Sequence, residues 1–215
     1  MSVAVLLKAA IAEMRLRGQD PAELRDSGGV ATFAAILHRG AETWGLVAGA
    51  VAATPPDLAG AGALLTSRRT FAPDRDPAHR SFLQDLRIAA DARGFGQGVG
   101  GDTFLLAVAP VYAALSRGEE QPRGWIDVVL SALSEAAALP GRGDDLRARA
   151  ARAHTAWGRR RLLRQAAQVD ARATELRERH PERIHRARRE VATFAADVAL
   201  TVAVFDAAFN GEAPD

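Results

Sequence analysis

Apolar residues recur near the 3.6-residue helical period along most of the chain. The clearest case is the segment from Val30 to Ala53, whose periodic apolar positions are Phe33, Ile36, Leu37, Trp44, Val47 and Val51. This period gathers the side chains on one helix face, which is then expected to face a core. No segment alternates apolar and polar residues with the period of two that marks a half-buried strand. The pattern predicts an all-α fold, built as a multi-helix bundle.

Capping and breaking residues set the bounds of the predicted helices. Pro55-Pro56 ends the long apolar helix, because proline cannot continue a helix. Asp76 followed by Pro77 is typical of a helix start, with Asp76 as the N-cap. Pro181 is predicted to break the last long amphipathic segment. The predicted helices cover residues 3–17, 30–53, 57–67, 78–92, 104–116, 125–139, 146–179 and 182–209.

The last two predicted helices carry apolar stripes with spacings of three and four residues. One stripe holds Leu162, Ala166, Val169, Ala173 and Leu176, and the other holds Ile184, Ala187, Val191, Phe194 and Val198. Stripes of this kind pack on a partner helix, so the two segments are expected to form a long antiparallel hairpin with its turn at Pro181. The sequence predicts a compact helical body over residues 1–141 and an arginine-rich hairpin over residues 142–215, packed together as one structural domain.

The length of the longest apolar segment and the number of cysteines indicate whether the chain lies in a membrane or in a reducing compartment. The apolar segment 30–53 is long enough to span a bilayer, but His38, Arg39 and Glu42 lie within it and would be costly in hydrocarbon. A buried core helix is therefore expected, with no membrane partner. The chain has no cysteine, so disulfides and thiolate chemistry are excluded and a reducing cytoplasm is expected.

The histidines and tryptophans are scattered, which indicates packing rather than chemistry. No second metal ligand follows a histidine at helical spacing, so neither a metal nor a cofactor is expected. The tryptophans are expected to anchor the core or the hairpin. The residues concerned are His38, His79, His154, Trp44, Trp125 and Trp157.

The formal net charge of +2 hides a strong asymmetry along the chain. Residues 142–190 carry 15 basic and 7 acidic side chains, a net charge of +8. Residues 1–141 carry 13 basic and 15 acidic side chains, and residues 191–215 carry 0 and 4. The basic character therefore belongs to the predicted hairpin.

The basic side chains of this segment are all arginine, whose planar fork binds phosphate and carboxylate groups in a bidentate manner. We interpret the segment as a face that binds nucleic acid or an acidic protein surface, in a non-catalytic accessory or scaffolding subunit that is a homo-oligomer or part of a larger complex. The alternative is a solvated helix surface, because arginine replaces lysine almost everywhere in this chain. The candidate contacts are Arg149, Arg152, Arg159, Arg160, Arg161, Arg164, Arg186 and Arg189.

A short motif offers an enzymatic alternative. The segment Arg179-His180-Pro181-Glu182-Arg183-Ile184-His185 resembles the Arg–(Asn/Asp/His)–four residues–His motif of HEPN-domain ribonucleases, which are all-helical and cut RNA without metal. The resemblance implies that Arg179 stabilises the phosphorane charge and that His185 acts as the acid or base. An interhelical turn with exposed histidines is the other interpretation.

A glycine-rich segment before residue 104 offers a third alternative. Backbone N–H groups that precede a helix can bind an anion. Gly101-Asp102-Thr103 before an apolar helix is similar to the phosphate-handling subunit of dihydroxyacetone kinases, and the Gly-x-Gly-x-Gly pattern resembles a motif of AllH-type proteins linked to allantoin breakdown. These resemblances imply an enzyme with a phosphorylated ligand; a flexible interhelical loop is the competing interpretation. The ligand-binding candidates are Gly96, Gly98, Gly100, Gly101, Asp102 and Thr103.

Overall fold

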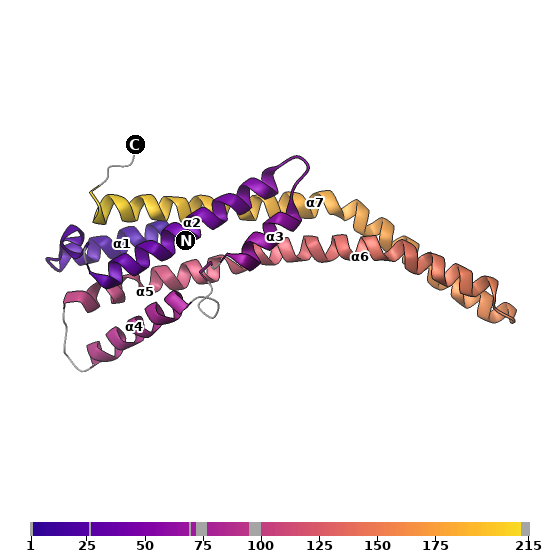
Figure 1. The fold of residues 1–215 in the computed structure, drawn as a ribbon, viewed down its shortest axis with the longest axis horizontal. Helices are drawn as coiled ribbons and strands as arrows, with labels where there is room; N and C mark the ends of the chain where they lie inside the picture. The colour runs from indigo at the N-terminus through magenta and orange to yellow at the C-terminus, as the bar shows by residue number, and fades with distance from the viewer. Residues whose placement is uncertain (1, 26, 69, 72–76, 95–99, 212–215) are drawn as a thin grey trace. The chain divides into compact units, whose positions relative to one another are not determined.

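Every regular element that the structure describes is helical, which confirms the predicted all-α class. The computed structural model describes residues 2–25, 27–68, 70–71, 77–94 and 100–211, with only the backbone described at 78, 90–94 and 100–102. The elements are α1 (Val3–Leu16), the 3₁₀ turn η1 (Pro21–Leu24), α2 (Gly28–Ala52), α3 (Leu58–Ser67), α4 (Pro77–Gly94), α5 (Gly100–Gly118), α6 (Glu120–Ala151) and α7 (Ala156–Phe209) (Figure 1).

The chain divides into two compact units. One comprises residues 1–123 and 190–215, and the other comprises residues 124–189. The predicted boundary between residues 141 and 142 lies inside α6, because this helix continues through Pro140 and past the predicted helix end at residue 139. We therefore describe the units as the structure divides them.

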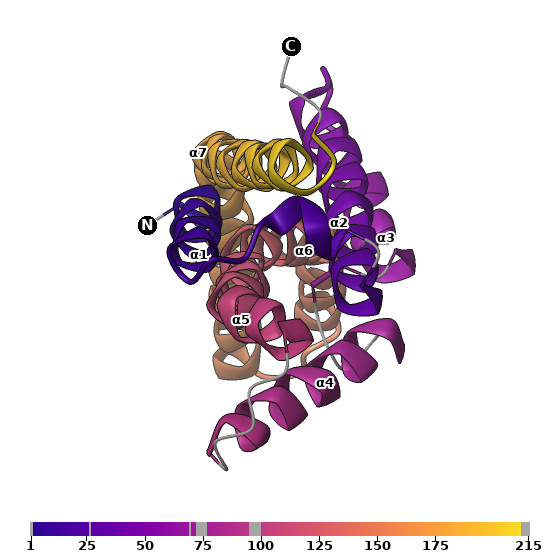
Figure 2. The same cartoon turned by 90° about the vertical axis from the view of Figure 1, so that its left-hand side faces the viewer.

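Aromatic rings form the centre of the first unit. The ring of Phe33 on α2 lies 5.5 Å from that of Phe82, 6.1 Å from that of Phe104 and 5.8 Å from that of Phe205, measured between centroids. The predicted α2 stripe is confirmed, since all six of its side chains are buried. Figure 2 looks along these helices and shows α1, α2, α5 and the yellow end of α7 grouped around this core. Aromatic burial of this kind supplies a large share of the stability of a small domain.

The start of α1 is capped by a residue from the other end of the chain. The side chain of Ser2 makes no cap for this helix. Instead the carboxylate of Asp197 on α7 accepts hydrogen bonds from the backbone N–H groups of Val3 at 2.8 Å and Ala4 at 3.4 Å. A negative charge at a helix N-terminus satisfies free N–H groups and complements the helix dipole. Asp197 thus fixes α1 beside α7.

In the second unit, side chains of α6 contact side chains of α7. Glu135, halfway along α6, forms a 2.9 Å ion pair with Arg172. Arg147, nearer the end of α6, binds Asp170. Between the helices lies an apolar cluster of Ala132, Leu139, Ala173 and Leu176, with Ala136 and Val169 packed against it.

The prediction that Pro181 ends a helix is wrong, because α7 continues through it. A proline in a helix interior costs about 3 kcal/mol, since it removes one hydrogen bond and crowds the preceding turn. Pro181 is exposed, however, while Leu176 and Ala187 on either side of it are buried. These two residues are eleven positions apart and share one helix face, so packing on both sides holds the helix together. The turn of the pair lies instead at residues 152–155.

One described helix, α7, is long and apolar enough to cross a membrane by length and composition alone. The core helix of a soluble protein passes the same test. The apolar segment 30–53, which is also long enough to span a bilayer, corresponds to α2, and the apolar stripe of α2 is buried in the core.

Candidate nucleic-acid interface

The turn between α6 and α7 forms one end of the second unit. The hydroxyl of Thr155 accepts a hydrogen bond from the N–H of Gly158 at 3.1 Å, which caps the start of α7. On the other side of the turn, the Nε of Arg152 donates to the carbonyl of Ala148 at 3.3 Å. These local bonds end α6 and start α7 within a few residues, so side chains from both helices meet at this end.

This end carries a run of positive charge that contains no carboxylate. From Leu146 to Val169 the chain has seven arginines and neither aspartate nor glutamate. We call residues 146–169 the basic tip. Like charges in so short a span repel one another unless a counterion or an anionic partner covers them.

Five predicted contact residues of the tip are exposed and have no ion pair to any residue that the structure describes. They are Arg152, Arg159, Arg160, Arg161 and Arg164. Arg149, also predicted, lies 3.7 Å from Asp145 in a weak pair. Arg147 is engaged more firmly, with Asp144 at 2.9 Å and with Asp170, and the hydrogen bond to Asp170 raises the pKa of its guanidinium. The free guanidinium groups therefore lie mainly on the first turns of α7.

Trp157 is the functional candidate that the sequence missed. It was expected to be a core or hairpin anchor, and this is wrong, because 73% of its surface is exposed. The guanidinium carbon of Arg161 lies 5.7 Å from the centroid of its ring. The sequence placed Trp157 inside the predicted helix 146–179, but the turn at residues 152–155 interrupts that segment and leaves Trp157 on the first turn of α7. An exposed indole beside arginines can stack on a nucleic-acid base.

A groove of about 530 Å³ lies between α6 and α7, and residues of the tip form part of its walls. Its walls include Arg142, Arg149, Gln165, Gln168 and Arg172. Arg172 is held by Glu135 and Glu175 at 2.9 and 3.0 Å, which raises its own pKa and lowers the pKa of Glu135. Arg142 and the two glutamine amides are the groups of this groove that could meet a ligand backbone.

The remaining predicted contacts lie away from the tip. The guanidinium carbon of Arg186 is 4.3 Å from the centroid of the Trp125 ring, so Arg186 packs on an aromatic face of α6. Arg189 is exposed near the end of the unit opposite the tip. The structure thus gathers the predicted arginines into a tip group and separates Arg186 and Arg189 from it.

The ribonuclease motif occupies an uninterrupted stretch of α7. Arg179 and His185 are both exposed, and the Nη2 atom of Arg179 lies 3.3 Å from the carboxylate of Glu175. Six positions along a helix turn a side chain to a direction about 120° away, so the two side chains diverge within one chain. The structure therefore offers no specific observation in favour of the ribonuclease alternative.

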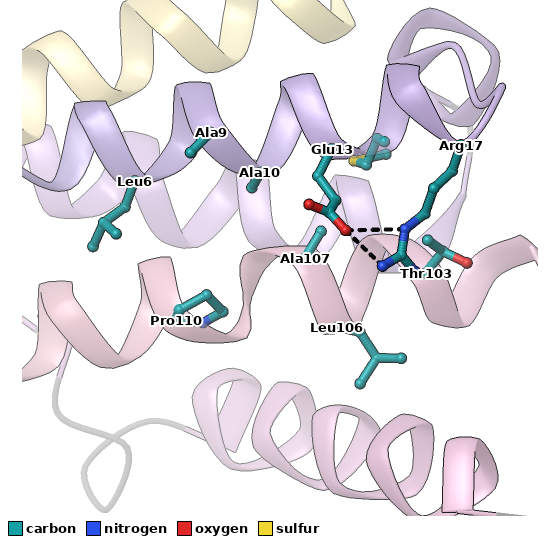
Figure 3. Close-up of a pocket in the computed structure, with 10 residues that line it drawn as sticks. Leu6, Ala9, Ala10, Glu13, Arg17, Thr103, Leu106, Ala107 and Pro110 are labelled. Carbon is teal, nitrogen blue, oxygen red and sulfur yellow. Dashed lines mark hydrogen bonds and ion pairs between the residues drawn. The ribbon is translucent and has the colours of Figure 1, made fainter.

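The glycine-rich segment is described in part. Gly96 and Gly98 lie outside the described residues, and the backbone of Gly100, Gly101 and Asp102 forms the first turn of α5. Thr103 lines a pocket of about 290 Å³ between α1 and α5 (Figure 3). The other lining residues are mostly apolar, and Arg17 is bound to Glu13 at 2.6 Å. Around this pocket, the described side chains offer no unpaired cation for a phosphate.

Metal chemistry has no support from the described residues, among which no group of three or more possible ligands could hold an ion. His38 lies 3.1 Å from Asp206 and His79 is buried, while His154 is exposed in the turn. Comparison of the sequence with protein-family models and with curated proteins, and of the fold with solved structures, finds no match for this chain.

Proposed function

We propose that residues 124–189 form an antiparallel helical hairpin that binds nucleic acid through its basic tip. In this proposal the protein is a non-catalytic accessory or scaffolding subunit of the cytoplasm, and the first unit is a helical bundle that carries the hairpin. The observation that carries the proposal is the row of five exposed arginines without a described ion-pair partner at the tip.

The contrast between the tip and the rest of the hairpin supports this choice. Outside the tip, carboxylates lie among the arginines of the second unit and bind Arg172 and Arg179. Between residues 150 and 169 the sequence has no carboxylate, so the five arginines of this run have no partner within it. A surface that keeps guanidinium groups unpaired retains their full charge for phosphate contacts.

The exposed indole of Trp157 supports nucleic acid over an acidic protein surface. Arg160, Arg161 and Arg164 follow it at three, four and seven positions, so they lie on the same side of α7. An aromatic ring with flanking arginines can bind a base and its neighbouring phosphates together. A purely acidic protein partner would need the charges and not the ring.

Titration of the full chain with a labelled single-stranded oligonucleotide at several salt concentrations tests the proposal. Binding should weaken as salt increases, with a slope of about −0.7 in log K against log salt for each phosphate neutralised. The variant Arg160→Gln/Arg161→Gln/Arg164→Gln should bind far more weakly and should show a slope reduced by about two.

The matched control is Arg172→Gln, which removes an arginine that is already paired with carboxylates. This control should bind nearly as well as the unaltered chain. Absence of binding at low salt contradicts the proposal. Equal losses in the triple variant and in the control would also contradict it, because the tip would then have no special role.

A further inference from the structure

Helix α1 is apolar on two opposite faces. One face is buried in the first unit and holds Val3, Leu7, Ile11 and Met14. The opposite face is exposed and holds Val5, Ala9, Ala12 and Leu16, of which Val5 is 53% and Leu16 87% exposed. A helix that is apolar on both sides is typical of one that packs on both sides.

The exposed residues of α1 have the spacing of a coiled-coil seam. Val5, Ala9, Ala12 and Leu16 are separated by four, three and four positions, which is the spacing of alternating d and a positions. We call these four residues the outer seam. The charged residues of α1 stand beside the outer seam and never within it: Lys8 and Arg15 lie on one flank, and Glu13 lies on the other.

A groove of about 430 Å³ separates α1 from the neighbouring part of α7. Its walls are mostly apolar, with Ala12, Leu200 and Ala203 among them, and also include the cations Lys8 and Arg15. Between Val191 and Asn210 the only charged side chains are Asp197 and Asp206. Both carboxylates have partners within the first unit. Asp197 accepts hydrogen bonds from the start of α1, and Asp206 lies 3.1 Å from His38.

Much of this part of α7 is therefore both exposed and uncharged. Only 28% of the residues in its most apolar window are buried. Neither a polyanion nor an acidic protein surface fits such a face, so its partner differs in kind from the partner of the basic tip.

We propose that the outer seam is the interface between two copies of this chain, with the two α1 helices parallel across a two-fold axis. In this arrangement Lys8 at a g position faces Glu13 of the partner subunit at an e position, and the symmetry repeats this pair. Glu13 is already bonded to Arg17 through one carboxylate oxygen, and its second oxygen remains available as an acceptor.

The same charges disfavour the antiparallel arrangement. There, Lys8 would face Arg15 of the partner subunit, since g positions face g positions when the helices run in opposite directions. Two such cationic contacts would weaken the pair. The charge pattern beside the outer seam thus selects both the occupant, which is a second copy with the complementary pattern, and its direction.

The mass of the full chain in sedimentation equilibrium tests the proposal directly. A dimer with twice the 22.8 kDa chain mass is expected at micromolar concentrations. Ala12→Glu should make the chain monomeric, because two carboxylates would meet in the seam. This variant should still fold, since Lys8 and Arg15 lie one helical turn away from the new carboxylate. The control Ala35→Glu, at an exposed alanine of α2, should remain dimeric.

Charge exchange tests the pairing across the interface. Lys8→Glu should weaken the dimer about tenfold, because two attractive contacts become repulsive. The double variant Lys8→Glu/Glu13→Lys should restore dimerisation. A double variant as weak as the single one contradicts the parallel pairing.

The chain has no cysteine, so single cysteines report the direction of the helices. In the parallel arrangement Leu16 lies opposite Leu16 of the partner subunit, and Leu16→Cys should form a disulfide-linked dimer under mild oxidation. Cross-linking only in a mixture of Val5→Cys and Leu16→Cys chains would show the antiparallel arrangement and overturn the proposal. A monomeric mass at all concentrations would overturn it as well, and so would a monomer that sediments with phosphatidylcholine vesicles in an Ala12-dependent manner.

Discussion

Arg172 on α7 holds the carboxylate of Glu135 on α6 through two hydrogen bonds, from Nε to Oε1 at 2.9 Å and from Nη2 to Oε2 at 3.4 Å. Both side chains are 44% exposed, so solvent screens the pair. The bidentate geometry nevertheless fixes the two helices of the second unit in one register, beside the apolar cluster that contains Leu139 and Leu176.

We expect the pair of Glu135 and Arg172 to stabilise the folded state at neutral pH and to lose this contribution in acid. Hydrogen bonding to Arg172 lowers the pKa of Glu135 below its ordinary value of 4.5. A carboxyl group with a lowered pKa stabilises the folded state above its ordinary pKa and loses this contribution as the pH falls through the lowered value. Thermal unfolding of the chain and of Glu135→Gln should therefore differ at neutral pH and converge at low pH. A constant difference across the pH range would contradict this expectation.

The contribution of Glu119 to the free energy of unfolding should depend on pH in the opposite direction. It is 3% exposed, and its carboxylate accepts a hydrogen bond from the N–H of Phe71 at 3.2 Å and lies 3.8 Å from Arg123. Burial raises its pKa above 4.5, and the contacts with Thr70, Arg123 and Phe71 offset only part of the shift. The folded state then binds a proton more tightly than the unfolded state. The free energy of unfolding therefore falls as the pH rises from the ordinary pKa of 4.5 through the raised pKa of Glu119.

The variant Glu119→Gln isolates this effect, because glutamine keeps a hydrogen-bond acceptor for Phe71 and cannot ionise. Denaturant unfolding of both chains from acid to neutral pH should show that the unaltered chain loses stability relative to the variant as the pH rises. A relative gain with rising pH would contradict the raised pKa.

Gly40 on α2 has a contact that only glycine permits. A Cβ atom at this position would lie 2.1 Å from Cζ of the buried Phe71 ring. Gly40→Ala should therefore destabilise the first unit by about 1 to 3 kcal/mol, the range found for overpacked cores. Gly45→Ala on the same helix is the control, since nothing lies within 4 Å of its Cβ position. It should stabilise the unit by about 1 kcal/mol through helix propensity alone. Denaturant unfolding of both variants measures the difference.

Trp157 gives a prediction that separates base stacking from charge. Trp157→Ala removes no charge, so its salt slope should equal that of the unaltered chain. Its affinity for single-stranded oligonucleotides should fall by about 1 to 3 kcal/mol, the usual loss for one stacked base. Binding to a fully paired duplex should change less, because paired bases cannot leave the stack without cost. Equal losses for both substrates would argue against stacking.

The sequence predicts helices well and their connections less well. The helical period identified the α2 stripe, including Phe33 and Trp44, because each side chain of that stripe packs on one core. Pro140 and Pro181 were expected to end helices, since local propensity disfavours both positions. Tertiary packing of residues such as Leu139 and Leu176 outweighs that local cost, and no local pattern reveals it.

The sequence predicted which segment carries the candidate site, but it did not predict which side chains of that segment are paired or exposed. Charge counting located the arginine-rich segment, because charge is a property of the sequence alone. Which arginines are paired depends on the partner helix: Arg172 meets Glu135 at a separation of 37 residues, while Arg164 meets no described carboxylate. The exposure of Trp157 followed from the position of the turn, which the sequence had placed at Pro181.

Replacement of Pro181 tests the continuity of α7. In an uninterrupted helix, Pro181→Ala restores an N–H that can bond to the preceding turn and removes the clash of the ring, so the chain should gain about 3 kcal/mol or less. Pro181 is exposed, so no core packing is lost. The control Pro77→Ala, at the first position of α4, should change stability little, because an N–H there has no helical partner. Denaturant unfolding followed by circular dichroism measures both. If the helix ended at Pro181, the two variants would behave alike, so a clear gain for Pro181→Ala alone identifies the continuous helix.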